Sequence, residues 1–109
     1  MKLYFWFLEI PWKDEPYIRF EECKVTEKPK TYKFENGAPR GLYRAFIKKD
    51  EVNHLHTDYF IGFISDKPDH KMAKKTIKNF FNRKISDLKG EIVRYESYAK
   101  AAERFGGDE

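Results

Sequence analysis

The sequence predicts an α+β fold, in which an N-terminal antiparallel sheet of four or five strands is followed by a long C-terminal helix. Through residue 65, short apolar or alternating segments are separated by turns that contain Pro, Gly, Asn and Asp, a pattern typical of antiparallel strands. From residue 66, apolar side chains recur every three or four positions, which indicates a helix. Because 109 residues provide one small core, we expect a single domain, with the sheet over 1–65 and the helix over 66–105.

The strongest strand signal lies over residues 2–10, where large apolar side chains occupy both alternating faces. Such a strand is expected at the centre of the sheet, covered on both sides. A polar turn bounded by Pro11 and Pro16 follows, and this short connection makes the next strand, over 17–25, antiparallel to the first. Further strands are expected over residues 31–35, 42–49 and 59–64, with a turn over 50–58.

The helix is expected to run from Lys67 to Phe105 and to end at Gly106-Gly107. Asp66 is a suitable N-cap residue, and Pro68 fits a first helical turn. At about 1.5 Å per residue, this helix is longer than a domain of this size is wide. Either the helix projects from the sheet, or it breaks or kinks at Gly90, since glycine costs about 1 kcal/mol inside a helix.

The apolar residues of this helix form a seam with alternating spacings of four and three. They are Phe81, Ile85, Leu88, Ile92, Tyr95, Ala99 and Ala102. This is the heptad pattern of helices that pack along their length. A homodimer or higher oligomer, paired through Ile85, Leu88, Ile92, Tyr95 and Ala99, would cover the seam. A helical hairpin that folds back at Gly90 within one chain is the alternative.

The positive charge is concentrated in one segment. Residues 67–89 contain eight basic and two acidic side chains, a net charge of +6, while residues 1–66 are neutral overall and residues 90–109 carry −2. An anionic partner would be drawn to the basic segment, although a lysine-rich face exposed to water is the explanation that we favour. Acidic residues interleave elsewhere and no nucleic-acid-binding motif is evident, so nucleic-acid binding ranks third among the functions that we consider.

No catalytic constellation is evident, and we expect a protein that is not an enzyme. Cys23 has no candidate base nearby in the sequence, and the adjacent carboxylates Glu21 and Glu22 would point to opposite faces of a strand. His54-Leu55-His56 followed by Asp58 has spacing that can bind a metal, but without a second cluster we expect a polar turn, no metal and no cofactor. One cysteine and no apolar run of about 20 residues predict a cytoplasmic protein without a membrane span.

A binding site for a small anionic ligand is the favoured function class. Aromatic faces stack on nucleobases, and arginine hydrogen-bonds phosphate oxygens. The candidate residues are Trp12, Arg40, Tyr43, Arg44, Arg94 and Tyr98. Trp12 follows a proline in a turn that no core requires, and Arg94 and Tyr98 lie one helical turn apart. The alternative is that the tryptophan covers the core and the arginines are only solvated.

Several segments resemble small proteins of clostridial phages and mobile elements. They are the Lys-Leu-Tyr-Phe-Trp-Phe strand, Glu22-Cys23, residues 27–33, residues 47–52 and the long charged helix. Within that group the architecture is similar to the Thoeris anti-defence sponge family, in which an antiparallel sheet carries extended C-terminal helices. The resemblance covers most of the chain, but no ligand-binding motif of the family matches position by position, so no site residue is taken from it.

This resemblance implies a phage-encoded protein that acts in the host bacterial cytoplasm. It would sequester a nucleotide-derived immune signal, a cyclic ADP-ribose isomer or a cyclic oligonucleotide, without cleaving it. The alternative is a protein-directed inhibitor of a host defence complex, as anti-CRISPR proteins are.

Overall fold

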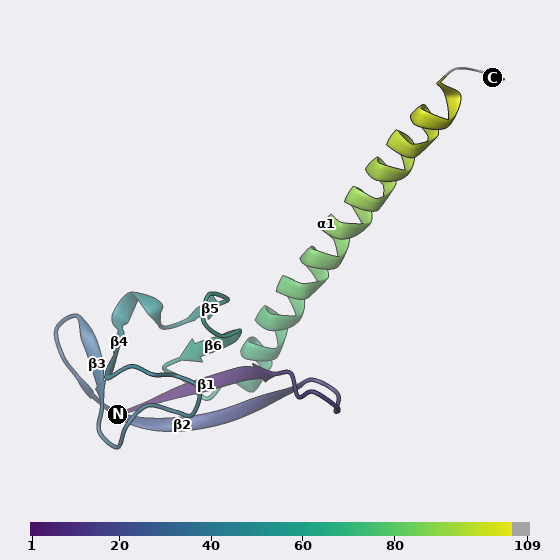
Figure 1. Cartoon of the computed structure of the whole chain (residues 1–109). Coiled ribbons are helices and arrows are strands. Elements are labelled where there is room, and N and C mark those ends of the chain that lie inside the picture. The colour runs from purple at the N-terminus through teal and green to yellow at the C-terminus, as the bar shows by residue number, and fades with distance from the viewer. Residues whose placement is uncertain (106–109) are drawn as a thin grey trace. The chain divides into compact units, whose positions relative to one another are not determined.

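A computed structural model describes residues 1–105 and confirms the α+β class. The chain forms two compact units, one that ends at Ile77 and one that begins at Lys78. Figure 1 shows the strands and the single long helix. The strands are β1 (Lys2–Glu9), β2 (Tyr17–Glu27), β3 (Thr31–Phe34), β4 (Phe46–Lys48), β5 (His54–His56) and β6 (Gly62–Ser65). A 3-10 turn, η1 (Lys49–Glu51), and the helix α1 (His70–Arg104) complete the described elements.

The strands form one antiparallel sheet in the order β4-β3-β2-β1-β6-β5. β1 lies between β2 and β6, as its two apolar faces predicted. One face places Leu3, Phe5 and Phe7 in the core. On the other face, Trp6 packs against Phe20. β1 is therefore covered on both sides.

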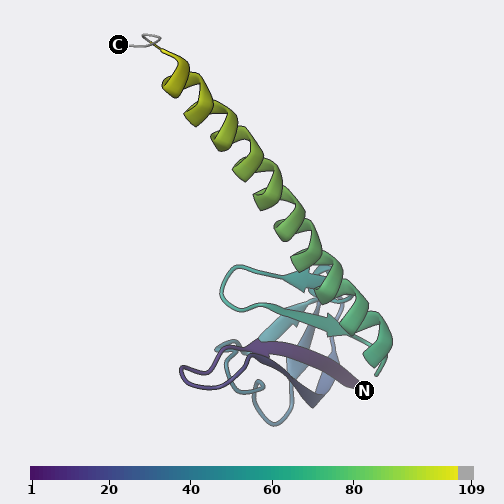
Figure 2. The ribbon, with the colours of Figure 1, turned by 90° about the vertical axis from the view of Figure 1, so that its right-hand side faces the viewer.

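The sheet curls because β2 pairs with two partners along its length (Figure 2). Its first part, through Lys24, pairs with β1, whereas Val25, Thr26 and Glu27 pair with β3. Residues from five of the six strands and from two loops enclose the core. The core residues are Leu3, Phe5, Phe7, Val25, Tyr32, Phe34, Leu42, Ile47, Val52 and Ile64.

The number of strands is six rather than four or five. The additional strand is β5, in a segment for which the sequence predicted a polar turn. Its pairing with β6 is set by Asn53, which adopts a left-handed conformation with φ of 64° and donates its backbone N–H to the Ile64 carbonyl at 2.6 Å. Asn tolerates this conformation better than most residues. β4 is shorter than predicted, since it begins only at Phe46.

The helix begins at His70, three residues later than predicted. Asp69, rather than Asp66, caps it, because the Asp69 Oδ1 accepts a hydrogen bond from the Met72 backbone N–H at 2.9 Å. Pro68 disfavours helical geometry at the residue before it, which explains why Lys67 lies outside the helix. Lys67 instead donates its backbone N–H to the Ser65 hydroxyl at 3.1 Å.

α1 is continuous through Gly90, so of the two alternatives for this helix the break is wrong, and so is the hairpin that folds back there. A Cβ at Gly90 would meet no atom within 4 Å, and one glycine in a helix of 35 residues costs too little to break it. The glycines expected to end the helix lie outside the described residues. Within residues 1–105, no helix combines the length and apolar character that a membrane crossing needs.

Candidate ligand-binding site

Trp12 lies outside the core, as predicted. Its side chain is 91% exposed in the turn between β1 and β2, and the Lys13 ammonium lies 4.9 Å from the centre of its ring. Arg40 lines a cavity of about 410 Å³ together with Lys2, Glu21 and Asn36. Tyr43 and Arg44 line a different cavity of about 400 Å³. The structure therefore distributes these four predicted residues over separate places and brings only Tyr43 and Arg44 together.

Arg94 and Tyr98 lie on α1, in the unit that begins at Lys78. Both side chains are exposed, and the Arg94 guanidinium lies 5.5 Å from the centre of the Tyr95 ring. Their participation in a ligand site together with the loop residues stays a prediction.

The cavity at Tyr43 and Arg44 is the better candidate site because of its aromatic lining. Tyr59 and Phe60 complete it, with Gly41 and Leu42 beside them. Tyr43 is 96% exposed and Tyr59 is 100% exposed. Among the described residues, neither ring packs against another aromatic ring. Two tyrosines that do not contribute to the core thus border one cavity, of a volume that is usual for small-molecule sites.

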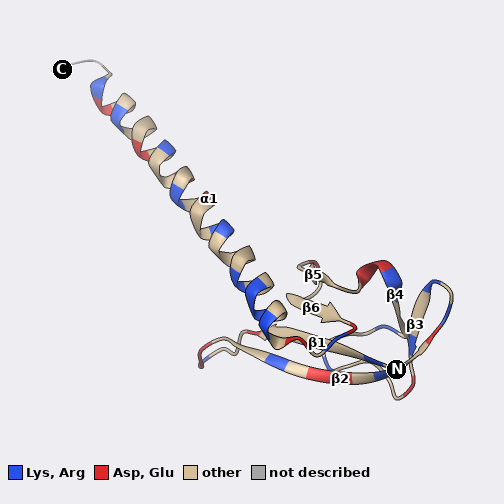
Figure 3. Ribbon diagram, turned by 180° about the vertical axis from the view of Figure 1, so that it is seen from behind, with Lys and Arg blue, Asp and Glu red and all other residues tan. Residues whose placement is uncertain are grey.

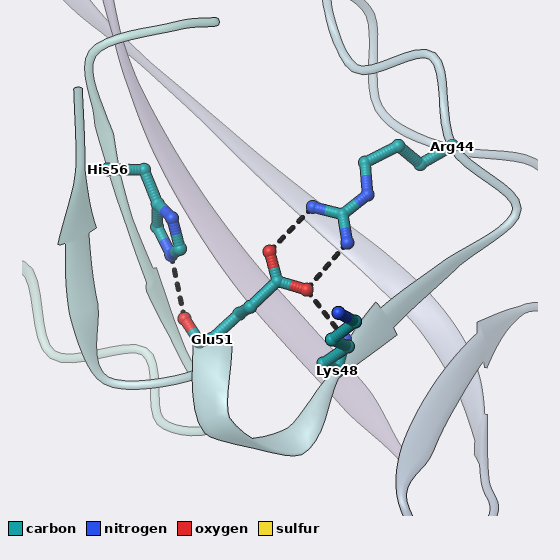
Figure 4. Close-up of polar contacts among 4 residues, drawn as sticks. All are labelled: Arg44, Lys48, Glu51 and His56. Carbon is teal, nitrogen blue, oxygen red and sulfur yellow. Dashed lines mark hydrogen bonds and ion pairs between the residues drawn. The ribbon is translucent and has the colours of Figure 1, made fainter. Parts of the chain in front are cut away.

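A network of polar contacts holds Arg44 in place (Figure 4). The Arg44 Nη1 and Nη2 atoms each lie 2.6 Å from a Glu51 carboxylate oxygen. The same carboxylate accepts the Lys48 backbone N–H at 2.9 Å. The hydrogen bonds from Arg44 lower the pKa of the Glu51 carboxyl below its usual value, and Glu51 in turn raises the pKa of Arg44. The guanidinium is therefore both charged and fixed.

His56 extends this network to Phe60, which also lines the cavity. The His56 Nε2 lies 2.8 Å from the Glu51 carbonyl oxygen, and since that oxygen can only accept, Nε2 carries a hydrogen. The His56 ring stacks on Phe60, with ring centres 5.7 Å apart. Phe60 also packs on Phe7 at 5.3 Å. A Cβ at Gly62 would lie 2.9 Å from the Phe60 ring, so only glycine leaves room for the ring there.

The two histidines of β5 contact different parts of the structure. His54 lines a separate cavity of about 580 Å³ with Asp66 and Asp69, whereas His56 belongs to the Arg44 network. Over residues 1–105, no three His, Cys, Asp or Glu side chains lie close enough together to hold a metal ion. Cys23 is half-buried, and burial raises the pKa of its thiol, which reduces the fraction of reactive thiolate at neutral pH.

Sequence reasoning missed Glu51, His56, Tyr59 and Phe60 as site residues. Tyr59 lies in the loop that joins β5 to β6, and β5 itself was not predicted. The sequence placed Tyr59 in a strand over 59–64, but β6 begins only at Gly62, so Tyr59 lies in the loop before it. A sequence signal for Glu51 was absent, since its partner Arg44 is identified only by the three-dimensional contact.

The predicted oligomer seam is uncovered in the single chain. Ile85, Leu88, Ile92 and Tyr95 are each between 50% and 58% exposed, and Ala99 is exposed as well.

In comparisons with known proteins, no protein-family model, no curated protein and no solved structure matches this chain.

Proposed function

We propose that this chain is a non-catalytic binding protein for a small ligand that combines a planar aromatic ring with an anionic group, as a nucleotide does. One observation supports the proposal above all others. Two exposed tyrosines, Tyr43 and Tyr59, border a cavity of about 400 Å³ in which Arg44 is held by Glu51.

The tyrosines would supply most of the affinity. Stacking of a base on an aromatic side chain contributes about 1–3 kcal/mol, and both rings are free to receive one. Three N–H donors of Arg44 remain, because a guanidinium carries five and Glu51 uses two of them. A phosphate would share Arg44 with Glu51 rather than neutralise an isolated charge, so the arginine orients the ligand more than it attracts it.

The specific form of this proposal is sequestration of a nucleotide-derived immune signal by a phage-encoded protein in the bacterial cytoplasm. It rests on the sequence resemblance to anti-defence sponges together with the cavity. A sponge acts by mass action, so it requires tight binding and slow release and no turnover. A second candidate, inhibition of a protein complex, is favoured by the uncovered apolar face of α1, which would then contact the target.

The proposal is tested by mass spectrometry of the small molecules that heat releases from protein purified out of signal-producing cells. Calorimetric titration with cyclic ADP-ribose isomers and cyclic dinucleotides then gives the affinity. We expect Tyr59→Ala and Tyr43→Ala each to weaken binding roughly five- to hundredfold, the equivalent of one lost stacking contact.

Trp12→Ala is the matched control, because it removes an equally exposed aromatic ring outside the cavity. Affinity that falls in Trp12→Ala and not in Tyr59→Ala would place the ligand at the turn between β1 and β2. If no ligand is released and no compound of the panel binds below about 10 μM, the proposed function is wrong.

A further inference from the structure

The apolar face of α1 is uncovered in the single chain, and the sequence of the helix indicates what binds it. We define the α1 seam as Ile85, Leu88, Ile92, Tyr95, Ala99 and Ala102, all of which lie in the unit that begins at Lys78. Each is exposed in the single chain. Monomeric proteins rarely leave such a continuous apolar stripe in contact with water.

The spacing of the α1 seam assigns heptad positions. Ile85, Ile92 and Ala99 occupy position a, and Leu88, Tyr95 and Ala102 occupy position d. The flanking e positions hold Lys89, Glu96 and Glu103, and the g positions hold Lys84, Glu91 and Tyr98. In paired helices, these flanking residues set the orientation of the partner. The charges therefore distinguish a parallel from an antiparallel second copy.

A parallel second copy would bring like charges together. In that orientation each g residue meets the e residue of the next heptad on the other helix. Lys84 would then face Lys89 of the second copy, and Glu91 would face Glu96 of the second copy. Both contacts are repulsive, and each occurs twice. Parallel pairing would also stack alanine on alanine and tyrosine on tyrosine along the seam.

With an antiparallel second copy, one register avoids both the like-charge contacts and the pairing of identical side chains. With Ile92 opposite Tyr95 of the second copy, Leu88 faces Ala99 and Ile85 faces Ala102, so that a large side chain always meets a smaller one or fills the space beside it. In the same register, Lys89 lies beside Glu96 of the second copy, and the symmetry of the pair repeats this contact. Charge and size thus independently favour the same arrangement.

We propose that the α1 seam binds a second copy of this chain in antiparallel orientation, with Ile92 opposite Tyr95 and Lys89 beside Glu96 across the interface. The proposal does not depend on the proposed ligand site, which lies in the other compact unit. It commits to self-association and leaves the seam with no role in binding a different protein.

Disulfide mapping tests the orientation. Both preparations use full-length chains that carry Cys23→Ser, which removes the native thiol. One preparation also carries Leu88→Cys and the other Ala99→Cys. In the proposed register these two positions face each other across the interface. We expect a cross-linked heterodimer when the two are mixed and oxidised. Neither variant should cross-link with itself, because positions 88 and 99 are about 16 Å apart along a helix and a disulfide needs Cα atoms within about 7 Å.

Efficient self-cross-linking of Leu88→Cys would show parallel pairing and overturn the proposal. So would a monomeric mass for the unmodified protein, measured by light scattering at about 50 μM, and that result would assign the seam to a different protein.

Charge reversal gives a second test, because it weakens dimerisation in one orientation and strengthens it in the other. Lys89→Glu places two acidic residues face to face in the antiparallel pair, and we expect dimerisation at low salt to weaken roughly three- to tenfold. In a parallel pair the same change would face Lys84 and strengthen dimerisation. Adding Glu96→Lys to Lys89→Glu should restore the original affinity. Lys100→Glu, at a position outside the interface, is the matched control, and helix content measured by circular dichroism verifies that each variant folds.

Discussion

At the scale of single residues, Glu51 connects three backbone segments. It pairs with Arg44 from the loop before β4 and with the backbone N–H of Lys48, while its own carbonyl accepts from His56. A charged hydrogen bond contributes about 1.5–3 kcal/mol, and less where water reaches the pair. The Arg44 side chain remains 34% exposed, so we assign the pair about 1 kcal/mol.

This pair predicts how stability depends on pH. Arg44 lowers the pKa of Glu51 in the folded state, below the usual 4.5. The stabilisation is therefore complete above about pH 4.5 and is lost as the pH falls through the lower folded-state pKa. We expect wild type to exceed Glu51→Gln in free energy of unfolding by about 1 kcal/mol at pH 7, and the difference to shrink at pH 3. Urea denaturation at both pH values measures it.

Glu15→Gln is the control for this measurement, because Glu15 is exposed in the turn between β1 and β2. A difference between wild type and Glu51→Gln that is the same at pH 7 and pH 3 would show that the charge of Glu51 does not contribute.

At the scale of the elements, the periodic patterns were predictive and the short pairings were not. β1 was placed at the sheet centre because its apolar residues occupy both faces, and the pattern of α1 was long enough to identify a helix. The sequence does not predict β5, because its three residues are too few to establish an alternating pattern and its pairing depends on β6. The helix start was misplaced because Asp66 and Asp69 are both suitable caps, and only Pro68 decides between them. The positions of Tyr59 and His56 at the cavity could not be predicted either, because the pairing of β5 with β6 sets them.

Replacement of Gly90 tests whether α1 tolerates rather than requires this glycine. Because a Cβ there meets open space, Gly90→Ala should stabilise the helix by about 1 kcal/mol. In the heptad pattern, Gly90 lies away from the α1 seam, so self-association should not change. Thermal unfolding followed at 222 nm measures the effect.

Gly62→Ala is the contrasting variant for the glycine test. Its Cβ would lie 2.6 Å from the Trp6 carbonyl oxygen, so we expect it to destabilise the sheet. A melting temperature that falls in Gly90→Ala would indicate that the helix bends at Gly90 in solution.

At the scale of the whole molecule, the two proposed binding surfaces belong to different compact units, and this makes them separable. In the proposed antiparallel register, Tyr98 would lie beside Glu91 of the second copy, whereas the sequence analysis predicts Tyr98 in the ligand site. A variant that disrupts the seam, such as Ile92→Asp, would leave ligand affinity unchanged if the cavity at Tyr43 and Tyr59 is sufficient. It would weaken binding if Arg94 contributes to the site, as the sequence suggested.

The basic segment is the remaining surface whose role must be decided. The eight basic side chains of residues 67–89 are all exposed, and none has a carboxylate partner within 4.0 Å among the described residues. Figure 3 shows them along the first part of α1 and just before it. Such a surface attracts any polyanion, and attraction alone does not make a specific nucleic-acid site.

We expect duplex DNA to bind weakly and with a steep dependence on salt. If roughly four phosphates are contacted, the association constant falls about a hundredfold between 50 and 200 mM salt. Fluorescence anisotropy of a labelled 20-base-pair duplex measures this, and replacing Lys74 and Lys75 with glutamine should flatten the salt dependence, whereas Lys13→Gln should not. Nanomolar affinity at 150 mM salt would contradict the prediction and make nucleic-acid binding the leading function, because charge on this segment alone cannot supply it.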